Sequence, residues 1–415
     1  MQRGYLVGVE LNEHTCQISY CEEGQTEPKT AERIPLVISK EGQEWVYGER
    51  AGEEGICDLL SLAEKHDMIQ VGENTYEGIW LLSLYIQLVL KQFHHIETIV
   101  FSLPEIDVDI VHLLKSVGQK LGIAKEKVYV QDNRESFCYY MFHQPKELWQ
   151  YESTLFYCDR SGVRTYMLKK LRTGYEKGRD TFVTVDEVAN ADWEELAMVY
   201  PLANEDGQKE ADEQFNQFIK SVFNRKLISS VFLIGEGFEK NWYPNSLRTL
   251  CNGRRAFQGD NLYSKGACYA ARYKDDESSG GLVYLDETKM TEQICLKLRV
   301  NGMDAWYPIV QWGTKWYEND KQFEILLEDT EDIEIHVESL AKRSVRAIKV
   351  PLENLPERGK YTVRLQVNVI FQDEHVCEIT WKDVGFGNFF GSSGFQTQTV
   401  IELGGRDGQF NSLSW

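Results

Sequence analysis

Val231-Phe232-Leu233-Ile234 is a short apolar run without a polar face, and Gly235-Glu236-Gly237 follows it directly. A run this short, closed by two glycines, predicts a strand that is buried on both faces and ends in a tight loop. Ligands gather at the carboxyl ends of such strands. A single Gly-x-Gly is also typical of an ordinary tight loop between a strand and a helix, so both interpretations stay open.

The residues on either side of this run predict helices that pack on a sheet. Ahead of it, 212–223 is expected to form an amphipathic helix. Its apolar face consists of Phe215, Phe218, Ile219, Val222 and Phe223. Behind the run come a short helix at 245–250, a strand at 255–257 and a helix of small residues at 265–271, which can approach a neighbouring backbone closely.

Composition and charge restrict the class of protein. A chain of 415 residues is expected to form two or three domains, and 42% hydrophobic residues are typical of a folded globular protein. The net charge of -20 argues against a nucleic acid or an anionic membrane as partner, since no basic stripe could replace phosphate counterions. The first residues do not resemble a signal peptide and 79–90 is too short to span a bilayer, so a cytoplasmic protein is expected.

The nine cysteines are scattered along the chain, without a C-x-x-C pair and without a histidine at metal-ligand spacing. This pattern predicts reduced thiols that are mostly buried, and it gives no reason to assign a metal.

The first 273 residues repeat one pattern of strands followed by alternating strands and helices. In the first half we expect strands at 6–10, 15–20, 34–38, 44–48, 98–103 and 128–130, and helices at 74–93, 110–121 and 133–142, with Asn74 and Glu77 as a capping pair. In the second half, strands at 154–158, 163–171 and 182–185 repeat the opening meander. The pattern predicts an α/β domain over 1–273, with halves of about 1–150 and 151–273 built from a meander and βαβ units.

The pattern changes after 274–286, a charged and then Gly/Ser-rich stretch that we interpret as a linker. From 287 to 404 polar and apolar residues alternate with a period of two, which predicts an all-β sandwich. Its expected strands are 292–300, 322–327, 333–337, 345–350, 361–371, 375–381 and 397–403. The glycine- and phenylalanine-rich stretch 385–394 is expected to be a mobile loop, and 405–415 a tail.

Several stretches are similar to motifs of one protein family. These are Gly4 to Glu10, 34–38 with 46–51, Val100 to Pro104, Gln131 to Arg134, Ile234 to Gly237, and Leu282 to Asp286. In this order, and followed by the β-region 297–403, they resemble the seventy-kilodalton heat-shock chaperones of the actin-like ATPase superfamily. The resemblance covers nearly the whole chain. It implies an actin-like ATPase fold of two halves with reduced outer lobes, then a sandwich similar to the chaperone substrate-binding domain, with no helical lid expected after it.

The resemblance also implies where a nucleotide and Mg²⁺ would bind if that site is retained. The positions that match the family's motifs are Gly8, Glu10, Asn12, Asp132, Asp159, Ser161, Gly162, Gly235 and Gly237. The loops depart from the family, however. Leu11-Asn12-Glu13-His14 replaces Leu-Gly-Thr-Thr, so Glu13 adds a negative charge, and only one glycine remains in 157–162. Arg160 could contribute charge to a phosphate or pair with nearby carboxylates.

These departures leave three hypotheses. In the first, the chain is a non-catalytic, chaperone-like protein with a degenerate nucleotide site, which binds a polypeptide through its sandwich. In the second it is a divergent, Mg²⁺-dependent ATP hydrolase, in which Glu10, Asp132 and Asp159 hold the ion through waters. In the third it is an actin-like assembly protein. Aromatic candidates for the polypeptide site are Trp306, Tyr307, Trp312, Trp316 and Tyr317, although each could instead pack in the sandwich core.

Overall fold

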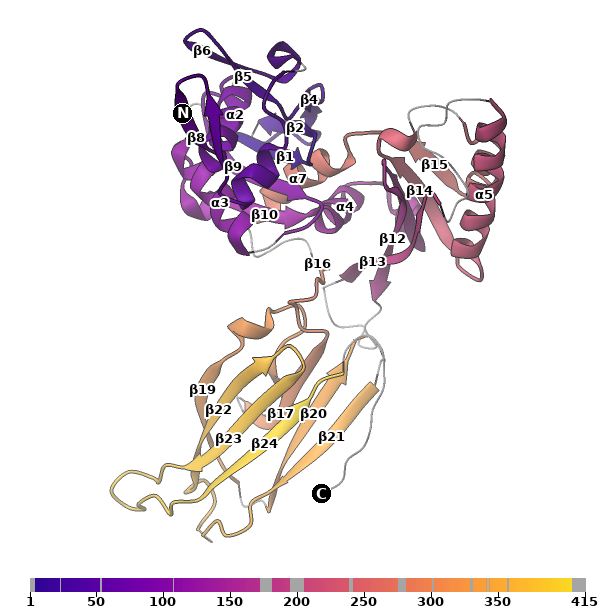
Figure 1. The fold of residues 1–415 in the computed structure, drawn as a ribbon. Coiled ribbons are helices and arrows are strands. Elements are labelled where there is room, and N and C mark those ends of the chain that lie inside the picture. Colours follow the sequence, from indigo (N-terminus) through magenta and orange to yellow (C-terminus); the bar gives the residue numbers. More distant parts are fainter. Residues whose placement is uncertain are drawn as a thin grey trace. The chain divides into compact units, whose positions relative to one another are not determined.

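The computed structural model describes residues 4–22, 24–52, 54–106, 108–171, 181–194, 205–238, 242–274, 281–300, 302–328, 331–340, 342, 344–356 and 358–404. The chain forms two compact units (Figure 1). Unit 1 comprises Met1–Lys170 and Thr184–Leu282, and unit 2 comprises Leu171–Val183 and Val283–Trp415. Unit 1 mixes helices with sheets, whereas unit 2 consists mainly of strands, as the sequence predicts.

The first sheet of unit 1 has the strand order β10-β9-β1-β2-β3, and β4 also pairs with β2. Its strands are β1 (Tyr5–Leu11), β2 (Thr15–Glu22), β3 (Lys29–Thr30), β4 (Ile34–Pro35), β9 (Ile96–Leu103) and β10 (Val128–Asp132). β2 is antiparallel to β1, whereas β9 is parallel to both β1 and β10. The expected first antiparallel pair and the βαβ units that follow are therefore confirmed, whereas the predicted strand at 44–48 lies outside this sheet.

Two layers of helix cover this sheet. The helices of the first half are α1 (Leu59–Glu64), α2 (Gly78–Leu90), α3 (Val108–Lys120) and α4 (Asn133–Phe142). On one face, side chains of α1, α2 and α3 share a core with Val7, Val9 and Phe101. On the other face, Leu6 and Val100 pack against α7 (Leu262–Tyr273), the helix of small residues.

A pair of hairpins flanks this first half. They are formed by β5 (Ile38–Glu41) with β6 (Glu44–Tyr47) and by β7 (Met68–Val71) with β8 (Asn74–Glu77). The predicted capping pair was wrong, because Asn74 and Glu77 belong to β8 and α2 begins only at Gly78, without a side-chain cap. The strand pairing of Asn74 with Val71 across Gly72 takes precedence over the local capping pattern.

The second sheet repeats the order of the first, as β15-β14-β11-β12-β13, and β16 is added at its edge. Its strands are β11 (Glu152–Cys158), β12 (Gly162–Leu171), β13 (Thr181–Asp192), β14 (Ile228–Ile234), β15 (Arg255–Gln258) and β16 (Leu282–Tyr284). β11 is antiparallel to β12 and parallel to β14, and β14 is parallel to β15. The predicted strand at 231–234 thus lies between two parallel neighbours.

Two helices pack on this second sheet, α5 (Glu205–Phe223) and α6 (Pro244–Leu250). The amphipathic face is confirmed, since Phe215, Ile219 and Val222 are buried. The helix starts earlier than predicted, at Glu205 rather than at 212. The part of the predicted irregular connection at 195–204 lies outside the described residues.

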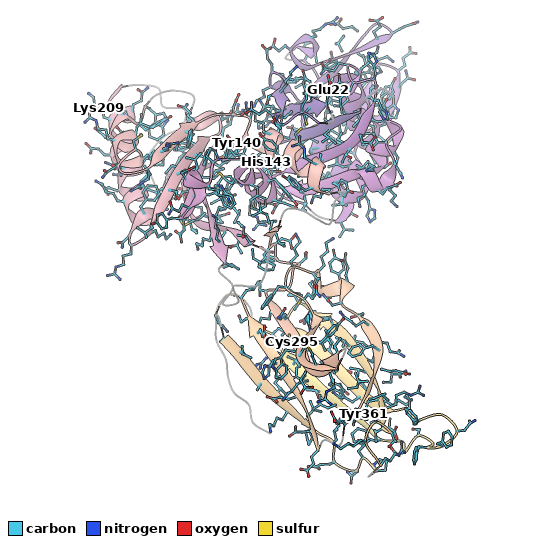
Figure 2. All side chains as sticks on the ribbon, turned by 180° about the vertical axis from the view of Figure 1, so that it is seen from behind. Glu22, Tyr140, His143, Lys209, Cys295 and Tyr361 are labelled. Carbon is cyan, nitrogen blue, oxygen red and sulfur yellow. The ribbon has the colours of Figure 1, made fainter. Side chains whose placement is uncertain are left out.

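α7 follows the second half in sequence but packs on the first half. Gly266 lets it approach α4, because a Cβ there would lie closer than 3.0 Å to the carbonyl of Ser136. His143 at the end of α4 stacks on Tyr269 of α7 with ring centroids 3.8 Å apart, and its Nε2 lies 3.1 Å from the hydroxyl of Tyr273. Figure 2 shows His143 next to Tyr140, which also lies on α4.

The sandwich of unit 2 consists of two antiparallel four-stranded sheets with the orders β18-β17-β20-β21 and β19-β22-β23-β24. The strands are β17 (Glu292–Val300), β18 (Met303–Val310), β19 (Lys321–Leu326), β20 (Asp332–Ser339), β21 (Ser344–Pro351), β22 (Arg364–Asp373), β23 (Val376–Asp383) and β24 (Gln396–Glu402). Leu296, Val367 and Trp381 belong to one buried core that joins both sheets. The predicted sandwich is confirmed. β18 is an additional strand that was not among those predicted from the sequence.

The described part of the predicted linker, 281–286, is not a free tether. Residues 282–284 form β16, and the backbone N–H of Leu285 donates to the carbonyl of Val183 at 2.8 Å. Leu285 is fully buried with Phe182 and Leu340 in a small core of unit 2. The start of β13, with Phe182 and Val183, therefore belongs to unit 2, so the chain enters this unit twice.

Candidate functional site

The predicted phosphate-binding residues lie mainly at the carboxyl ends of β1 and β11, the equivalent first strands of the two sheets. Tyr157 on β11 interacts electrostatically with Glu10 on β1, so the two strand ends face one region of unit 1. Most of the predicted residues prove to be engaged with the protein's own groups there.

Asn12 closes the turn between β1 and β2. Its Oδ1 accepts hydrogen bonds from the backbone N–H groups of His14 at 3.0 Å and of Thr15 at 2.7 Å. The N–H of Asn12 itself donates to the carbonyl of Thr15. These three N–H groups are therefore used within the turn and do not point to a ligand.

Asp159 is held within its own loop in the same way. Its Oδ1 accepts from the N–H and the hydroxyl of Ser161, and its Oδ2 accepts from Nη2 of Arg164 at 2.9 Å. Burial raises the pKa of Asp159, but the hydrogen bonds from Ser161 and the charge of Arg164 outweigh burial and lower it. A carboxylate already neutralised by an arginine is a weak ligand for a magnesium ion.

The two glycines after β14 are required by packing. Gly235 has a φ of +98°, and a Cβ there would lie closer than 3.0 Å to the carbonyl oxygen of Cys158. A Cβ on Gly237 would meet the Sγ of the same cysteine. Arg160 Nε donates to Glu236 Oε1 at 3.0 Å, which ties this turn to the loop after β11. Of the two open roles for Arg160, the structure shows the pairing with a carboxylate.

Gly8 and Gly162 also lie against the protein's own backbone. A Cβ on Gly8 would lie closer than 3.0 Å to the backbone of Ser264 and Cys268 in α7. Gly162 has a φ of +144°, and its Cβ would meet the carbonyl of Ala191 on β13. Both glycines are therefore explained by close packing of neighbouring elements.

Asp132 caps α4. Its Oδ1 accepts from the N–H of Glu135 at 2.7 Å, and its Oδ2 accepts from Nε of Arg134 at 2.8 Å. Burial raises the pKa of Asp132, an effect that the charge of Arg134 and the N–H of Glu135 reduce. An aspartate that caps a helix contributes about 1 kcal/mol to stability, which is sufficient reason for its presence.

Glu10 is the exception among these residues. Its side chain is buried at the end of β1, and its Oε2 has no hydrogen-bond partner among the described residues. Burial raises its pKa from 4.5 to about 7, while Arg33 and a hydrogen bond from the backbone of Ser264 act in the opposite direction. Because Ser264 lies in the first turn of α7, the carboxyl group sits at the positive end of a helix dipole.

The surroundings of Glu10 come from distant parts of the sequence. Arg33 donates from Nη2 to the carbonyl of Asp260 at 2.8 Å, which joins the segment before β4 to the start of α7. The rings of Tyr157 and Tyr263 lie 6.4 Å apart, and Tyr263 is buried. The sequence reading missed Arg33 and Tyr263, and no local motif marks either residue.

The predicted aromatic residues of the sandwich have different roles. Only Tyr307 and Tyr317 are exposed, each by about half. Trp306 is half-buried and stacks on His336 with centroids 3.4 Å apart. Trp312 donates from Nε1 to the carbonyl of Glu338 at 3.1 Å, and Trp316 packs against the sandwich core. These three tryptophans therefore contact other groups of the protein instead of forming an exposed binding surface.

Tyr307 lines a groove of about 630 Å³ between β18 and β19, which we call the edge groove. Each of these strands lies at one edge of its sheet. The groove has apolar walls with polar side chains beside them. The apolar residues are Leu298, Tyr307, Pro308, Ile309, Phe323 and Ile325. An extended chain fits such a place, since an edge strand presents unpaired backbone groups.

One end of the sandwich carries a second apolar surface that the sequence reading missed. Its exposed residues include Met303, Leu326, Tyr361 and Phe389. They come from the β17–β18 turn, the end of β19, the segment before β22 and the loop 384–395. Strand pairing brings the last three to one end of their sheet, and a hydrogen bond from Arg299, beside the β17–β18 turn, to the hydroxyl of Tyr361 joins the turn to this end. Figure 2 shows Tyr361 at this end, away from Cys295 on β17. Tyr361 has a φ of +60°, a conformation that is uncommon for a residue with a side chain.

All nine cysteines are free thiols, and all except Cys57 and Cys251 are buried, which confirms that they are mostly buried. Among the described residues, His, Cys, Asp and Glu side chains do not gather in threes that could hold a metal ion. None of the described helices combines the length and the apolar character that crossing a bilayer would need.

Comparisons with known proteins identify the family but no activity. No curated protein matches the chain. Residues 289–403, the sandwich, match a domain of unknown function, DUF8552. Residues 22–287, which is more than half of the chain, match the family of unknown function DUF5716, C-terminal. The chain therefore belongs to the DUF5716 family, C-terminal part.

Proposed function

We propose that this protein is a non-catalytic relative of the seventy-kilodalton heat-shock chaperones, which binds an extended polypeptide in the edge groove of its sandwich. The proposal combines an actin-like scaffold in unit 1 with a binding function in unit 2. Supporting the scaffold, both sheets of unit 1 have the same order, in which three strands form an antiparallel meander and two further strands follow in parallel with the first.

The observation that carries the non-catalytic part is that the three phosphate-loop segments are bonded to the protein itself. Asn12 closes its own turn, Asp159 is paired with Arg164, and Glu236 is paired with Arg160. A triphosphate needs free backbone N–H groups and a carboxylate available to Mg²⁺. Binding it here would require these contacts to break.

The polypeptide part is supported by the edge groove. Its apolar walls provide pockets for side chains, and the two edge strands provide backbone donors and acceptors. This is the arrangement in which an added strand gains affinity from main-chain hydrogen bonds and specificity from alternate side chains. We therefore expect the ligand to be an extended, mainly apolar segment.

The experiment for the non-catalytic part is thermal unfolding of the full chain with and without millimolar MgATP. A ligand at about a hundred times its Kd adds roughly 2.7 kcal/mol to stability, a shift of about 2 to 4 °C for a domain of this size. We expect no shift. A shift that disappears in the Asp159→Asn variant would contradict the proposal.

The experiment for the polypeptide part is fluorescence anisotropy with a library of labelled, mainly apolar heptapeptides. Tyr307→Glu places a charge in the groove and should weaken binding, whereas Tyr307→Phe keeps the ring and should bind as the natural chain does. Equal binding by all three proteins, or no binding by the natural chain, would remove the edge groove as the site.

A divergent ATPase is the second candidate, and one observation favours it. Oε2 of Glu10 is buried and lacks a hydrogen-bond partner among the described residues. A bound ion or ligand would supply such a partner. In that case the shift with MgATP should appear in the natural chain and vanish in Glu10→Gln. The same thermal experiment thus separates the two candidates.

A further inference from the structure

The loop 384–395, which we call the aromatic loop, differs in composition from the rest of the chain. It contains no charged residue, although 27% of the residues of the chain are charged. Phe389 is 87% exposed, and Phe386 and Phe390 are exposed by more than a third. Exposed aromatic residues grouped in this way are typical of a protein-protein contact.

Buried polar contacts fix the base of the aromatic loop. The carboxylate of Asp383 is fully buried and accepts from the N–H groups of Gly385 at 2.9 Å and Ser393 at 2.8 Å. Arg358 donates to this carboxylate at 3.2 Å and to the carbonyl of Gly391 at 2.8 Å. The loop is therefore anchored at both of its ends.

Backbone hydrogen bonds also hold the tip of the aromatic loop together. The N–H of Phe386 donates to the carbonyl of Phe390 at 2.7 Å, and the reverse bond measures 3.4 Å. Arg358 lies over the ring of Phe390. A tip with this much internal bonding loses little conformational entropy when a partner covers Phe389, which favours its use as an anchor.

We propose that the aromatic loop of one copy of this chain docks in the edge groove of a second copy, with Phe389 as the anchor. This inference rests on the proposed function, because it names an occupant of the edge groove. The walls of the groove are apolar and complement the exposed phenylalanines of the loop; they are formed by side chains such as Leu298, Ile309 and Phe323. The loop in turn offers an uncharged surface and a short paired segment that can lie along an edge strand.

The partner is a second copy rather than the same copy because of where the two features lie in the sandwich. The aromatic loop leaves β23 at the end where β19 finishes with Leu326. The edge groove extends from there toward Lys321 and Glu318, at the opposite end of β19. To fill its own groove, the loop would have to give up the contacts with Asp383 and Arg358.

Charge gives a second argument for this contact surface. Each copy carries a net charge of -20, so two copies repel one another at most orientations. Contact through a loop without any charged residue avoids placing like charges together. Salt screens the remaining repulsion, so association through this apolar contact should become stronger as ionic strength rises.

The proposed contact joins two different surfaces, so it is a head-to-tail contact. In a pair, the copy that donates its loop keeps a free groove and the other copy keeps a free loop, so the pair still carries one of each. Such contacts continue into rings or open chains instead of stopping at a dimer. The average mass should therefore increase continuously with protein concentration.

The test is sedimentation velocity of the full chain from low micromolar to several hundred micromolar, at low and at high salt. Phe389→Asp should weaken association by about tenfold or more, since the anchor is replaced by a charge. Tyr307→Glu, which alters the groove, should weaken it similarly, while Tyr307→Phe should leave it unchanged. Met68→Asp is the matched control, because Met68 is an exposed apolar residue of unit 1 and should have no effect.

Mixing the two variants gives the sharpest result. Phe389→Asp keeps an intact groove and Tyr307→Glu keeps an intact loop, so together they can form one productive contact. We expect an equimolar mixture to form heterodimers and to stop there, while each variant alone stays monomeric. Circular dichroism and thermal midpoints close to those of the natural chain would show that both variants fold.

Three results would overturn the inference: a natural chain that is monomeric at every concentration, association that survives Phe389→Asp, or association that survives Tyr307→Glu. Peptide binding, measured at a concentration where the chain is monomeric, reports separately on the proposed function. Peptide binding without self-association would remove only the second copy as occupant. Self-association without peptide binding would remove only the polypeptide function.

Discussion

Gly235 illustrates how one residue can suggest a ligand site and yet be required for packing. With a φ of +98° and a carbonyl oxygen of Cys158 where a Cβ would lie, Gly235→Ala should lower the free energy of unfolding by roughly 2 to 4 kcal/mol. Chemical denaturation of both proteins measures this difference. Gly259→Ala is the control, since a Cβ at Gly259 meets nothing within 4 Å. If Gly235→Ala left the free energy of unfolding unchanged, the turn would be free to move away from Cys158.

Glu10 should make stability depend on pH in a particular direction. Burial raises its pKa from 4.5 to about 7, so between these values the folded protein holds a proton that the unfolded chain has lost. Stability is therefore full below about pH 4.5 and falls as pH rises through 7, by roughly 3 kcal/mol for a shift of this size.

Glu10→Gln removes this titration while keeping the shape of the side chain. Urea unfolding at pH 4.5 and pH 8 should show little difference between the two proteins at the lower pH and a more stable variant at the higher pH. If the variant gained the same stability at both values, the buried carboxyl group would not be the cause.

At the scale of the element, β16 lies beside β13 and leads directly into Leu285. Leu285 is fully buried between Phe182 and Leu340, so Leu285→Ala should lower the stability of unit 2 by about 2 to 4 kcal/mol through the cavity it leaves. Leu326→Ala makes the same change at a half-exposed leucine and should have less than half the effect. Calorimetric unfolding compares the two variants. Equal effects would show that the burial of Leu285 does not stabilise unit 2.

Elements with a regular apolar period could be predicted from sequence, whereas those fixed by pairing could not. α3 and α4 are predictable from sequence because their apolar faces or flanking residues are local features. β8 was mistaken for part of a helix, because Asn74 and Glu77 have capping spacing in either conformation. Only the pairing with β7 decides between the two, and pairing is not visible in a short window of sequence.

At the scale of the whole molecule, the alternation of elements predicted the two halves and the sandwich, but the site depends on distant contacts. The bond from Arg33 to Asp260 spans 227 positions, and that from Arg160 to Glu236 spans 76. Nothing in the residues near Arg33 indicates such a partner. The structure shows that several motif positions lie at the ends of β1 and β11, while the groups that contact them could be known only from the structure.

The course of α7 has a consequence for the synthesis of the protein. Ser19 on β2 bonds to Ser264 on α7 at 2.9 Å, and Gly8 touches the same helix, although about 250 residues separate the partners. Because the ribosome makes the chain from its N-terminus, one face of the first sheet stays uncovered until α7 emerges. The first half thus cannot finish folding before the second half has been translated. A truncation or a pause in translation before residue 262 would leave this apolar face open to chaperones and to aggregation.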